Sequence, residues 1–329
     1  MATTKTKVLI IGASGETGRS IANGLLEDGG FEVYSFTRPA SAQKPQLLDL
    51  AKKGLIIRQC DLSAPEEELA EALRGIDVVV SSVGPADQLS QLNIATAAKA
   101  AGVKRFVPCA FITVCAPGGI MWLRDEKEKV YNHIKQLKLT YTIIDVGWWY
   151  QIATPRLTSG KIDYAMTVAN DELVEGGKTP SAFVDLRDIG KYVTRIIVDP
   201  RTENKMVFSY NTVTSPEDIF AMVEKMSGEK VERKHVSKET VMARVEEGRA
   251  HSETYPFDAS KFTLRIAAEY QLSWGIRGDN VPSYAKYLGY LDAKELYPDF
   301  KPITLEEYIQ ELLSGTATGI YTDRISRIY

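Results

Sequence analysis

The fold of this chain is decided by Lys7-Val8-Leu9-Ile10-Ile11-Gly12-Ala13-Ser14-Gly15-Glu16-Thr17-Gly18. Its first half is a continuous apolar run, which is typical of a strand buried on both faces. Three glycines follow at the spacing G-x-x-G-x-x-G, and apolar side chains then recur four residues apart, as on one face of a helix. A strand, a glycine turn and a helix together place a pyrophosphate against helix N–H groups that lack intrahelical partners. The alternative, a flexible turn that happens to contain glycine, does not explain the buried strand. We therefore predict a dinucleotide-binding turn whose cofactor contacts are Gly12, Ser14, Gly15, Glu16, Thr17 and Gly18.

The composition is that of an ordinary globular protein, with 329 residues of which 44% are hydrophobic and 25% charged, and a net charge of −3. This balance argues against a nucleic-acid partner, and no apolar run approaches the ~20 residues that a membrane helix needs. The three cysteines have neither a disulfide pattern nor metal-ligand spacing, so we predict a reducing compartment and no metal site. The first strand begins too early to leave room for a signal peptide. We expect a cytoplasmic protein, a monomer or a homodimer, without a membrane partner.

Strands and helices alternate along the first half of the chain. Apolar runs at 32–37, 55–60, 76–82 and 105–108 are separated by helical segments, a rhythm that indicates parallel βαβ units with right-handed crossovers. The predicted fold class is therefore α/β, with a doubly wound parallel sheet of the NAD(P)-binding Rossmann type. After a further strand at 139–146 the alternation becomes less regular.

The end of the second strand indicates which dinucleotide binds. Proteins of this fold that prefer NAD carry an acidic residue there, which binds the ribose hydroxyl groups, whereas this chain carries Thr37 and Arg38. A cation suits the 2′-phosphate of NADPH, and a charge-assisted hydrogen bond of about 1.5–3 kcal/mol gives roughly 10- to 100-fold preference. The alternative is a solvated loop arginine. We predict NADPH as the cofactor, held by Arg38 and Lys44, with further contacts from Asp61 and Ser82 at the ends of the third and fourth strands.

The second half of the chain is predicted to form a smaller lobe. We assign residues 1–150 to an NADP-binding Rossmann domain and residues 151–329 to a C-terminal α/β substrate-binding lobe, some of whose strands rejoin the main sheet. Within this lobe we expect a β segment at 161–173 and mostly helix over 236–291, a stretch that contains many aromatic residues.

Five more stretches belong to a pattern that extends over nearly the whole chain. They are Ala97-Ala98-Lys99-Ala100-Ala101-Gly102-Val103-Lys104-Arg105-Phe106, Leu139-Thr140-Tyr141-Thr142-Ile143-Ile144, Asp188-Ile189-Gly190-Lys191-Tyr192-Val193, Asp199-Pro200-Arg201-Thr202 and Leu296-Tyr297-Pro298-Asp299. With the glycine turn and Arg38, this pattern resembles the NmrA-like, isoflavone reductase-like branch of the atypical short-chain dehydrogenase/reductase family. The resemblance implies NADPH-dependent reduction of phenolic compounds, as in phenylcoumaran benzylic ether and pinoresinol–lariciresinol reductases. The same family includes redox sensors that bind the dinucleotide without turnover.

The resemblance assigns a catalytic role to Lys127. Reductases of this branch carry a lysine near the start of the helix that follows the fifth strand, and Lys127 matches that position. Such an ammonium group holds the nicotinamide ribose or, directly or through water, donates a proton to the substrate as hydride arrives. The alternative is a solvated lysine in a charged helix, since Glu126, Glu128 and Lys129 flank it. The tyrosine of ordinary short-chain dehydrogenases would fall on Leu123 and is absent.

A literal Tyr-x-x-x-Lys pattern occurs at Tyr131 and Lys135. At ~1.5 Å rise per residue, Lys135 lies ~12 Å along the helix from Lys127, so both lysines cannot reach one nicotinamide. We interpret the match as chance. Tyr131 itself stands one turn beyond Lys127 on the same face, and we predict that it lines the catalytic site.

The loop after the fifth strand departs from the family. Where family reductases usually read Pro-Ser-Glu-Phe-Gly, this chain has Pro108-Cys109-Ala110-Phe111-Ile112, so Ser and Glu, and any proton relay through them, are lost. Cys109 is either a reactive thiol or a small buried side chain. Because doubly wound sheets bind ligands at the carboxyl ends of their strands, we assign Phe111 to the substrate.

Aromatic residues supply the rest of the predicted substrate pocket. Trp149 matches the position at which the family places an aromatic ring against the nicotinamide, and Trp148 precedes it. In the second lobe, Tyr270 and Trp274 belong to an aromatic run that suits a flat, apolar ligand. Core packing is the alternative for all four. We assign the four to the substrate, and Trp149 also to the cofactor.

These features predict an NADPH-dependent reductase that acts on an aromatic, phenolic or conjugated carbonyl-type metabolite in secondary metabolism. Hydride would pass from the nicotinamide to a ketone, a quinone-like carbon or a benzylic carbon, with Lys127 assisting protonation. Two alternatives stay open. One is a non-catalytic NADP(H) sensor that binds a regulatory protein, and the other is a redox-neutral isomerase or cyclase on the same fold.

Overall fold

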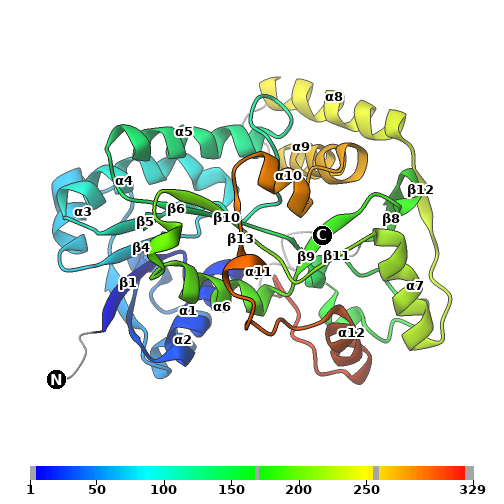
Figure 1. Ribbon diagram of the computed structural model, residues 1–329, viewed down its shortest axis with the longest axis horizontal. Helices are drawn as coiled ribbons and strands as arrows, with labels where there is room; N and C mark the ends of the chain where they lie inside the picture. The colour runs from blue at the N-terminus through cyan, green and yellow to red at the C-terminus, as the bar shows by residue number, and fades with distance from the viewer. Residues whose placement is uncertain (1–4, 167–169, 255–258, 323–329) are drawn as a thin grey trace.

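The computed structural model describes residues 5–166, 170–254 and 259–322 (Figure 1). A five-stranded parallel sheet with the strand order β3-β2-β1-β4-β5 forms the first half of the chain. Its strands are β1 (Thr6–Ile11), β2 (Phe31–Thr37), β3 (Ile56–Gln59), β4 (Val78–Ser81) and β5 (Arg105–Val107). This is the doubly wound sheet that the alternation of strands and helices predicted, so the fold class is confirmed.

Helices cover both faces of this sheet (Figure 1). On one face lie α1 (Glu16–Asp28), α2 (Pro45–Lys52) and α6 (Leu186–Ile196), and on the other α3 (Glu66–Leu73), α4 (Gln91–Ala100) and α5 (Trp122–Gln136). The side chains of β1 alternate between the two resulting cores. Val8 and Ile10 pack under α1 and α6, whereas Leu9 and Ile11 pack under α3 and α4. All four are at most 2% exposed, as a strand covered on both faces requires.

Three later strands extend the sheet beyond β5. Strand β6 (Thr142–Val146) is connected to β5 through the bridge between Phe106 and Tyr141, and β10 (Lys205–Ser209) and β13 (Leu291–Asp292) follow in parallel. The main sheet therefore contains strands from both sides of residue 150. The division into two domains at that residue stays a prediction.

The remaining elements form a second lobe beside the main sheet (Figure 1). Two small sheets, with the orders β11-β9-β7 and β12-β8, form its centre. Its strands are β7 (Trp148–Trp149), β8 (Glu172–Val174), β9 (Ser181–Val184), β11 (Thr212–Thr214) and β12 (Lys234–Val236). Its helices are α7 (Pro216–Ser227), α8 (Lys238–Thr254), α9 (Ala259–Tyr270) and α12 (Leu305–Ser314), whereas α10 (Pro282–Tyr287) and α11 (Ala293–Leu296) pack next to β13 of the main sheet. A π-helical stretch, Gln271–Arg277, continues α9.

The β segment predicted at 161–173 is wrong over most of its length. Residues Asp163–Ala165 form a short 3-10 turn, and the strand begins only at Glu172, while 167–169 lie outside the described residues. Ile162 and Ala165 are both 1% exposed. Their spacing of three is helical, so the core selects a turn here instead of an alternating strand.

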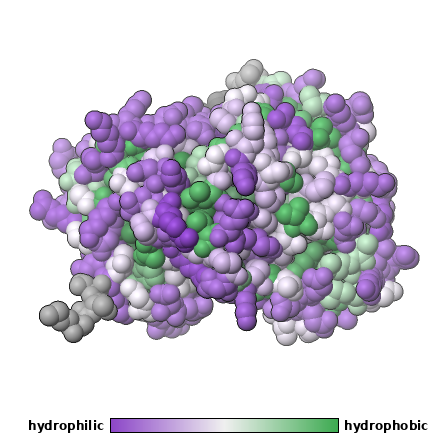
Figure 2. Space-filling view, viewed as in Figure 1, coloured by the Kyte–Doolittle hydropathy of each residue, from purple (hydrophilic) through white to green (hydrophobic). Residues whose placement is uncertain are grey.

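The surface is mostly polar on the face that Figure 2 shows, and hydrophobic residues are visible there only in small separate areas. In the part of the chain that the structure describes, no helix is long and apolar enough to cross a bilayer.

Candidate active site

The glycine turn opens into a cavity of about 820 Å³ at the carboxyl ends of the first strands. We call it the nucleotide cavity. Seven of the predicted cofactor residues line it together, namely Gly12, Ser14, Gly15, Arg38, Lys44, Asp61 and Ser82. These residues are spread over seventy positions of the sequence, from Gly12 to Ser82, and the parallel strands bring them to one edge of the sheet. Their individual roles stay predictions.

The turn has the close backbone contacts that a pyrophosphate cradle needs. Gly12 has φ +81°, and a Cβ there would lie 2.5 Å from the carbonyl oxygen of Ser82. A Cβ at Gly18 would lie 2.2 Å from the carbonyl oxygen of Gly12, so this glycine lets α1 pack against β1. The N-cap of α1 is Gly15, which has no side chain to satisfy the first N–H groups. A dinucleotide diphosphate therefore fits this turn. Thr17 lies beyond the cavity, in the first turn of α1.

The far end of the nucleotide cavity is charged. Arg38 and Lys44 are both exposed at its edge, where they can pair with a phosphate. Asp61 lines the same cavity, and its carboxylate accepts hydrogen bonds from the N–H and the hydroxyl of Ser63 at 3.0 and 2.8 Å. These bonds lower the pKa of Asp61. The two cations fit the 2′-phosphate that distinguishes NADPH from NADH.

The side chain of Glu16 is turned away from the nucleotide cavity. Its carboxylate pairs with Arg19 and accepts the backbone N–H of Tyr321 at 2.9 Å. It lines a different hollow of about 450 Å³, between α1, α6 and α12. This orientation keeps a negative charge from facing a bound pyrophosphate. A cofactor contact of Glu16 stays a prediction.

A second cavity of about 560 Å³ contains all five predicted substrate residues. We call it the aromatic cavity. The five are Phe111, Trp148, Trp149, Tyr270 and Trp274. The ring of Trp148 meets Trp274 edge to face, with ring centroids 4.4 Å apart, and lies 6.3 Å from the ring of Tyr270. The rings thus form a wall of this cavity, although Trp274 is only 2% exposed and also packs in the core, as the alternative interpretation expected.

Several polar residues of the aromatic cavity were not predicted. Glu172 and Gln271 line it, and Glu172 also receives a two-pronged ion pair from Arg244 at 2.7 and 3.0 Å. The Arg244 guanidinium lowers the pKa of the Glu172 carboxyl. Tyr321 enters from the C-terminal segment. No sequence signal could have found them, because the pairing of β8 with β12 and the return of the chain end are long-range events.

Lys127 is buried and, among the described residues, lines neither of the two cavities. It is 2% exposed, so it is not the solvated lysine of the alternative interpretation. Its Nζ donates to the carbonyl oxygen of Cys109 at 2.6 Å and to Oε1 of Gln88 at 3.1 Å. Burial lowers the pKa of this amine. Lys127 thus joins the loop after β4 to the loop after β5, and its catalytic role stays a prediction.

Tyr131 is placed in the core rather than in either cavity, as far as the described residues show. It is 1% exposed, and the guanidinium of Arg124 lies 5.6 Å from the centroid of its ring. Arg124 in turn pairs with Asp145 at 2.6 Å. One helical turn carries Tyr131 toward this buried pair and away from the loops that Lys127 contacts. The structure therefore gives no support to the catalytic assignment of Tyr131.

The glycine turn and the aromatic cavity are linked through Glu16, whose carboxylate accepts the N–H of Tyr321, a residue that lines the aromatic cavity. A Rossmann sheet with a phosphate-binding turn beside an aromatic-walled cavity defines a class of protein that binds a dinucleotide and an apolar small molecule together.

Comparisons with known proteins identify the family. The sequence pattern of the NmrA-like family matches residues 4–309, and the chain belongs to that family. The asnovolin J 5',6'-dehydrogenase of Aspergillus novofumigatus is 42% identical over 320 residues, which cover 96% of this chain and 98% of that protein. The phenylcoumaran benzylic ether reductase Betv6 of Betula pendula is 26% identical over 94% of this chain and 99% of its own length. The predicted resemblance is confirmed.

A solved structure agrees with the fold. The leucoanthocyanidin reductase of Vitis vinifera, solved as a binary complex with NADPH, superposes with a TM-score of 0.77. The two chains are 23% identical, and the match covers 94% of this chain and 99% of the other. At this identity the likeness shows the fold alone.

Proposed function

We propose that this chain is an NADPH-dependent oxidoreductase that transfers hydride between the nicotinamide and a carbon atom of a flat aromatic or conjugated metabolite. The predicted enzyme class and cofactor are confirmed by the comparisons. The relatives are named as a dehydrogenase and a reductase, and the similar solved structure, that of the leucoanthocyanidin reductase, is a complex with NADPH. The substrate class is our proposal. The observation that carries it is the aromatic cavity, whose wall consists of tilted and edge-on rings and includes Tyr321, a residue whose N–H donates to Glu16 next to the glycine turn.

The residues of this chain have distinct tasks in the proposed reaction. NADPH supplies the hydride when it is bound. The N–H groups of the glycine turn hold the pyrophosphate, and Arg38 and Lys44 hold the 2′-phosphate. The rings of Trp148 and Trp149 exclude water and orient a flat substrate.

Lys127 has two tasks in this proposal. Through its bonds to Cys109 and Gln88 it holds the loop after β5 against the loop after β4. A lowered pKa makes its ammonium group a stronger acid than an ordinary lysine. This supports the predicted donation of a proton to the substrate through water, since Lys127 lines neither cavity among the described residues.

The test is turnover measured by NADPH absorbance. Oxidation of NADPH is followed with a phenylcoumaran, an isoflavone and a quinone, and reduction of NADP+ is followed with asnovolin J, for which the fungal relative is named. Turnover of at least one compound, with NADPH preferred over NADH, is the expected result and agrees with a role in secondary metabolism. Tight binding of NADP+ and NADPH without turnover of any compound would favour the sensor. A rearranged product formed at constant NADPH would favour the isomerase or cyclase.

A further inference from the structure

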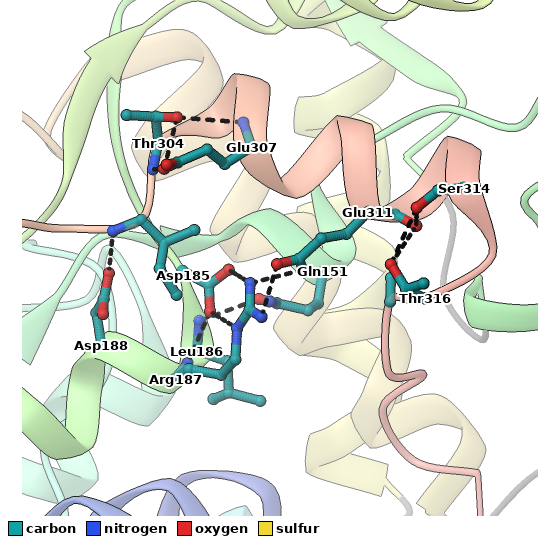
Figure 3. Close-up of polar contacts among 12 residues, drawn as sticks. Gln151, Asp185, Leu186, Arg187, Asp188, Thr304, Glu307, Glu311, Ser314 and Thr316 are labelled. Atoms are coloured by element: carbon teal, nitrogen blue, oxygen red, sulfur yellow. Dashed lines mark hydrogen bonds and ion pairs between the residues drawn. The ribbon is translucent and has the colours of Figure 1, made fainter.

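The C-terminal segment at residues 317–321, which we name the strap, follows α12 and ends at the glycine turn. Helix α12 is held against the start of α6 by Arg187. The Arg187 guanidinium lies between the carboxylates of Asp185 and Glu311, at 2.8 and 2.9 Å (Figure 3). Because Asp185 is fully buried, this contact fixes the position from which the strap begins.

The strap itself is anchored at both ends. At its start, the hydroxyl of Tyr164 accepts the N–H of Ala317 at 3.2 Å and donates to the carbonyl oxygen of Leu312 at 3.1 Å. At its end, Ile320 is 2% exposed and packs in the same apolar core as β1. Tyr321 follows with φ +54°, a left-handed backbone that bulky residues adopt only where their surroundings impose it.

Tyr321 connects the strap to the first turn of α1 and to the aromatic cavity. Its N–H donates to Oε1 of Glu16, in the first turn of the helix that follows the glycine turn. Its ring lines the aromatic cavity and lies 6.4 Å from the ring of Trp149, with an angle of 31° between the planes. The strap therefore forms the part of the aromatic cavity wall that lies next to Trp149.

We propose that the strap is the specificity-determining wall of the aromatic cavity. In this arrangement, Tyr321 and Trp149 set the width that is open to a planar ring system. Glu16 is a positioning residue, since it holds the Tyr321 backbone and directs no oxygen into the nucleotide cavity. The inference deepens the proposed function and rests on it for the identity of a substrate, but not for the binding of a planar aromatic probe.

The experiment uses flavone, an uncharged planar aromatic compound, and follows the quenching of tryptophan fluorescence in the presence of NADP+. We expect Tyr321→Ala to raise the Kd of flavone, and the KM of any substrate, roughly 10-fold, because one wall of the cavity loses its ring. The kcat and the Kd of NADPH should change less than about threefold. Tyr321→Phe keeps the ring and should recover most of the loss. Tyr287→Ala is the matched control, since Tyr287 is 82% exposed on α10.

The positioning role of Glu16 is tested in the same assay. Glu16→Ala removes the acceptor for the Tyr321 N–H and should raise the Kd of flavone roughly fivefold. Glu16→Gln retains an amide oxygen that can accept this N–H and should recover most of the affinity, which a purely electrostatic role of Glu16 would not allow.

Three results would overturn the proposal. The first is equal binding of flavone by the parent and by Tyr321→Ala, and the second is a parent protein that does not bind flavone. The third is a Tyr321→Ala variant with both a weaker affinity for NADPH and a lower melting temperature, because the strap would then only stabilise the fold. Flavone binding without turnover of any compound would instead overturn the proposed function and leave the strap in place.

Discussion

The nucleotide cavity and the aromatic cavity are lined by different kinds of chemical groups. The nucleotide cavity has glycine backbone at one end and exposed cations at the other. The aromatic cavity has a wall of rings and a few paired polar groups. Backbone N–H groups recognise a phosphate whatever the nearby side chains are, whereas apolar rings recognise shape and area. The difference leads us to expect that the cofactor is held by hydrogen bonds and charge, and the proposed substrate by packing.

Lys127 contacts a loop of each cavity, so we expect its substitution to have the largest effect of the variants considered below. Lys127→Met keeps the length of the side chain but removes the proton and leaves the Cys109 carbonyl without its 2.6 Å donor. General acid catalysis contributes on the order of 100- to 10,000-fold, and we expect kcat to fall within that range. Lys129→Met, on the same helix with a side chain 58% exposed, is the control.

The pH dependence of kcat tests the same role of Lys127. Burial lowers the folded-state pKa of Lys127 below its ordinary 10.5, and a lysine carries its proton only below its pKa. The kcat should therefore hold at low pH and decline as the pH rises through this lowered value. The Lys127→Met variant should lack this decline. A variant with normal kcat and unchanged NADPH affinity would exclude proton donation by Lys127.

Gly18→Ala tests the glycine turn of the nucleotide cavity. The new Cβ would lie 2.2 Å from the Gly12 carbonyl oxygen, a backbone atom that cannot move aside. Overpacking strain of roughly 3 kcal/mol lowers the free energy of unfolding, and the part of it that shifts the Gly12 carbonyl and the turn should reduce NADPH affinity by up to about 100-fold, measured by fluorescence titration. Gly29→Ala, at the other end of the same helix with no atom within 4 Å of its Cβ, should lower the melting temperature slightly and leave NADPH binding unchanged.

Arg38→Ala tests the charged end of the same cavity. Loss of one charge-assisted hydrogen bond to the 2′-phosphate, about 1.5–3 kcal/mol, should lower the preference for NADPH over NADH by roughly 10- to 100-fold. The ratio of kcat/KM for the two cofactors measures it. An unchanged ratio would show that Arg38 is a solvated loop residue. NADH affinity serves as the internal control, since NADH has no phosphate at this position.

Trp148→Leu tests the aromatic cavity and has the smallest expected effect. It removes the edge-to-face contact with Trp274 and the contact with Tyr270. Aromatic pairs contribute about 0.5–1.5 kcal/mol each, so the KM for an aromatic substrate should rise roughly fivefold while the Kd of NADPH does not change. Tyr284→Leu on α10, where Tyr284 stacks on Tyr287 at 5.9 Å, is the matched control. An equal effect of both variants would mean that Trp148 only supports the core.

Prediction from the sequence succeeded best where the signal was local. The strand, the glycine turn and the following helix lie within 23 consecutive residues, from Thr6 to Asp28, and their spacing alone indicates the cradle. Arg38 was found by its place at the end of a strand. The five aromatic residues assigned to the substrate share one cavity, but the signals that grouped them were a resemblance to a family, strand ends and composition, not spacing, and their contact with a substrate stays a prediction. The oligomeric state and the compartment stay predictions.

Lys127 and Tyr131 show the limit of what local sequence patterns can predict about the surroundings of a side chain. Both lie on one face of α5, and flanking charges suggested a solvated helix. The structure buries both, but Lys127 meets the loops after β4 and β5 while Tyr131 meets Arg124. Helical periodicity gives the face of a side chain and not the partner that this face will meet.

By itself, the sequence determined the Rossmann half of this protein, because alternating apolar periods, glycine spacing and strand ends are properties of neighbouring residues. Only the tertiary structure decided the aromatic cavity, the burial of Lys127 and the closure by the strap. Tyr321 meets Glu16 across 305 positions of the chain, and Gln88 meets Lys127 across 39. Such contacts exist because packing of the whole core brings distant segments together, and no local pattern of residues encodes that meeting.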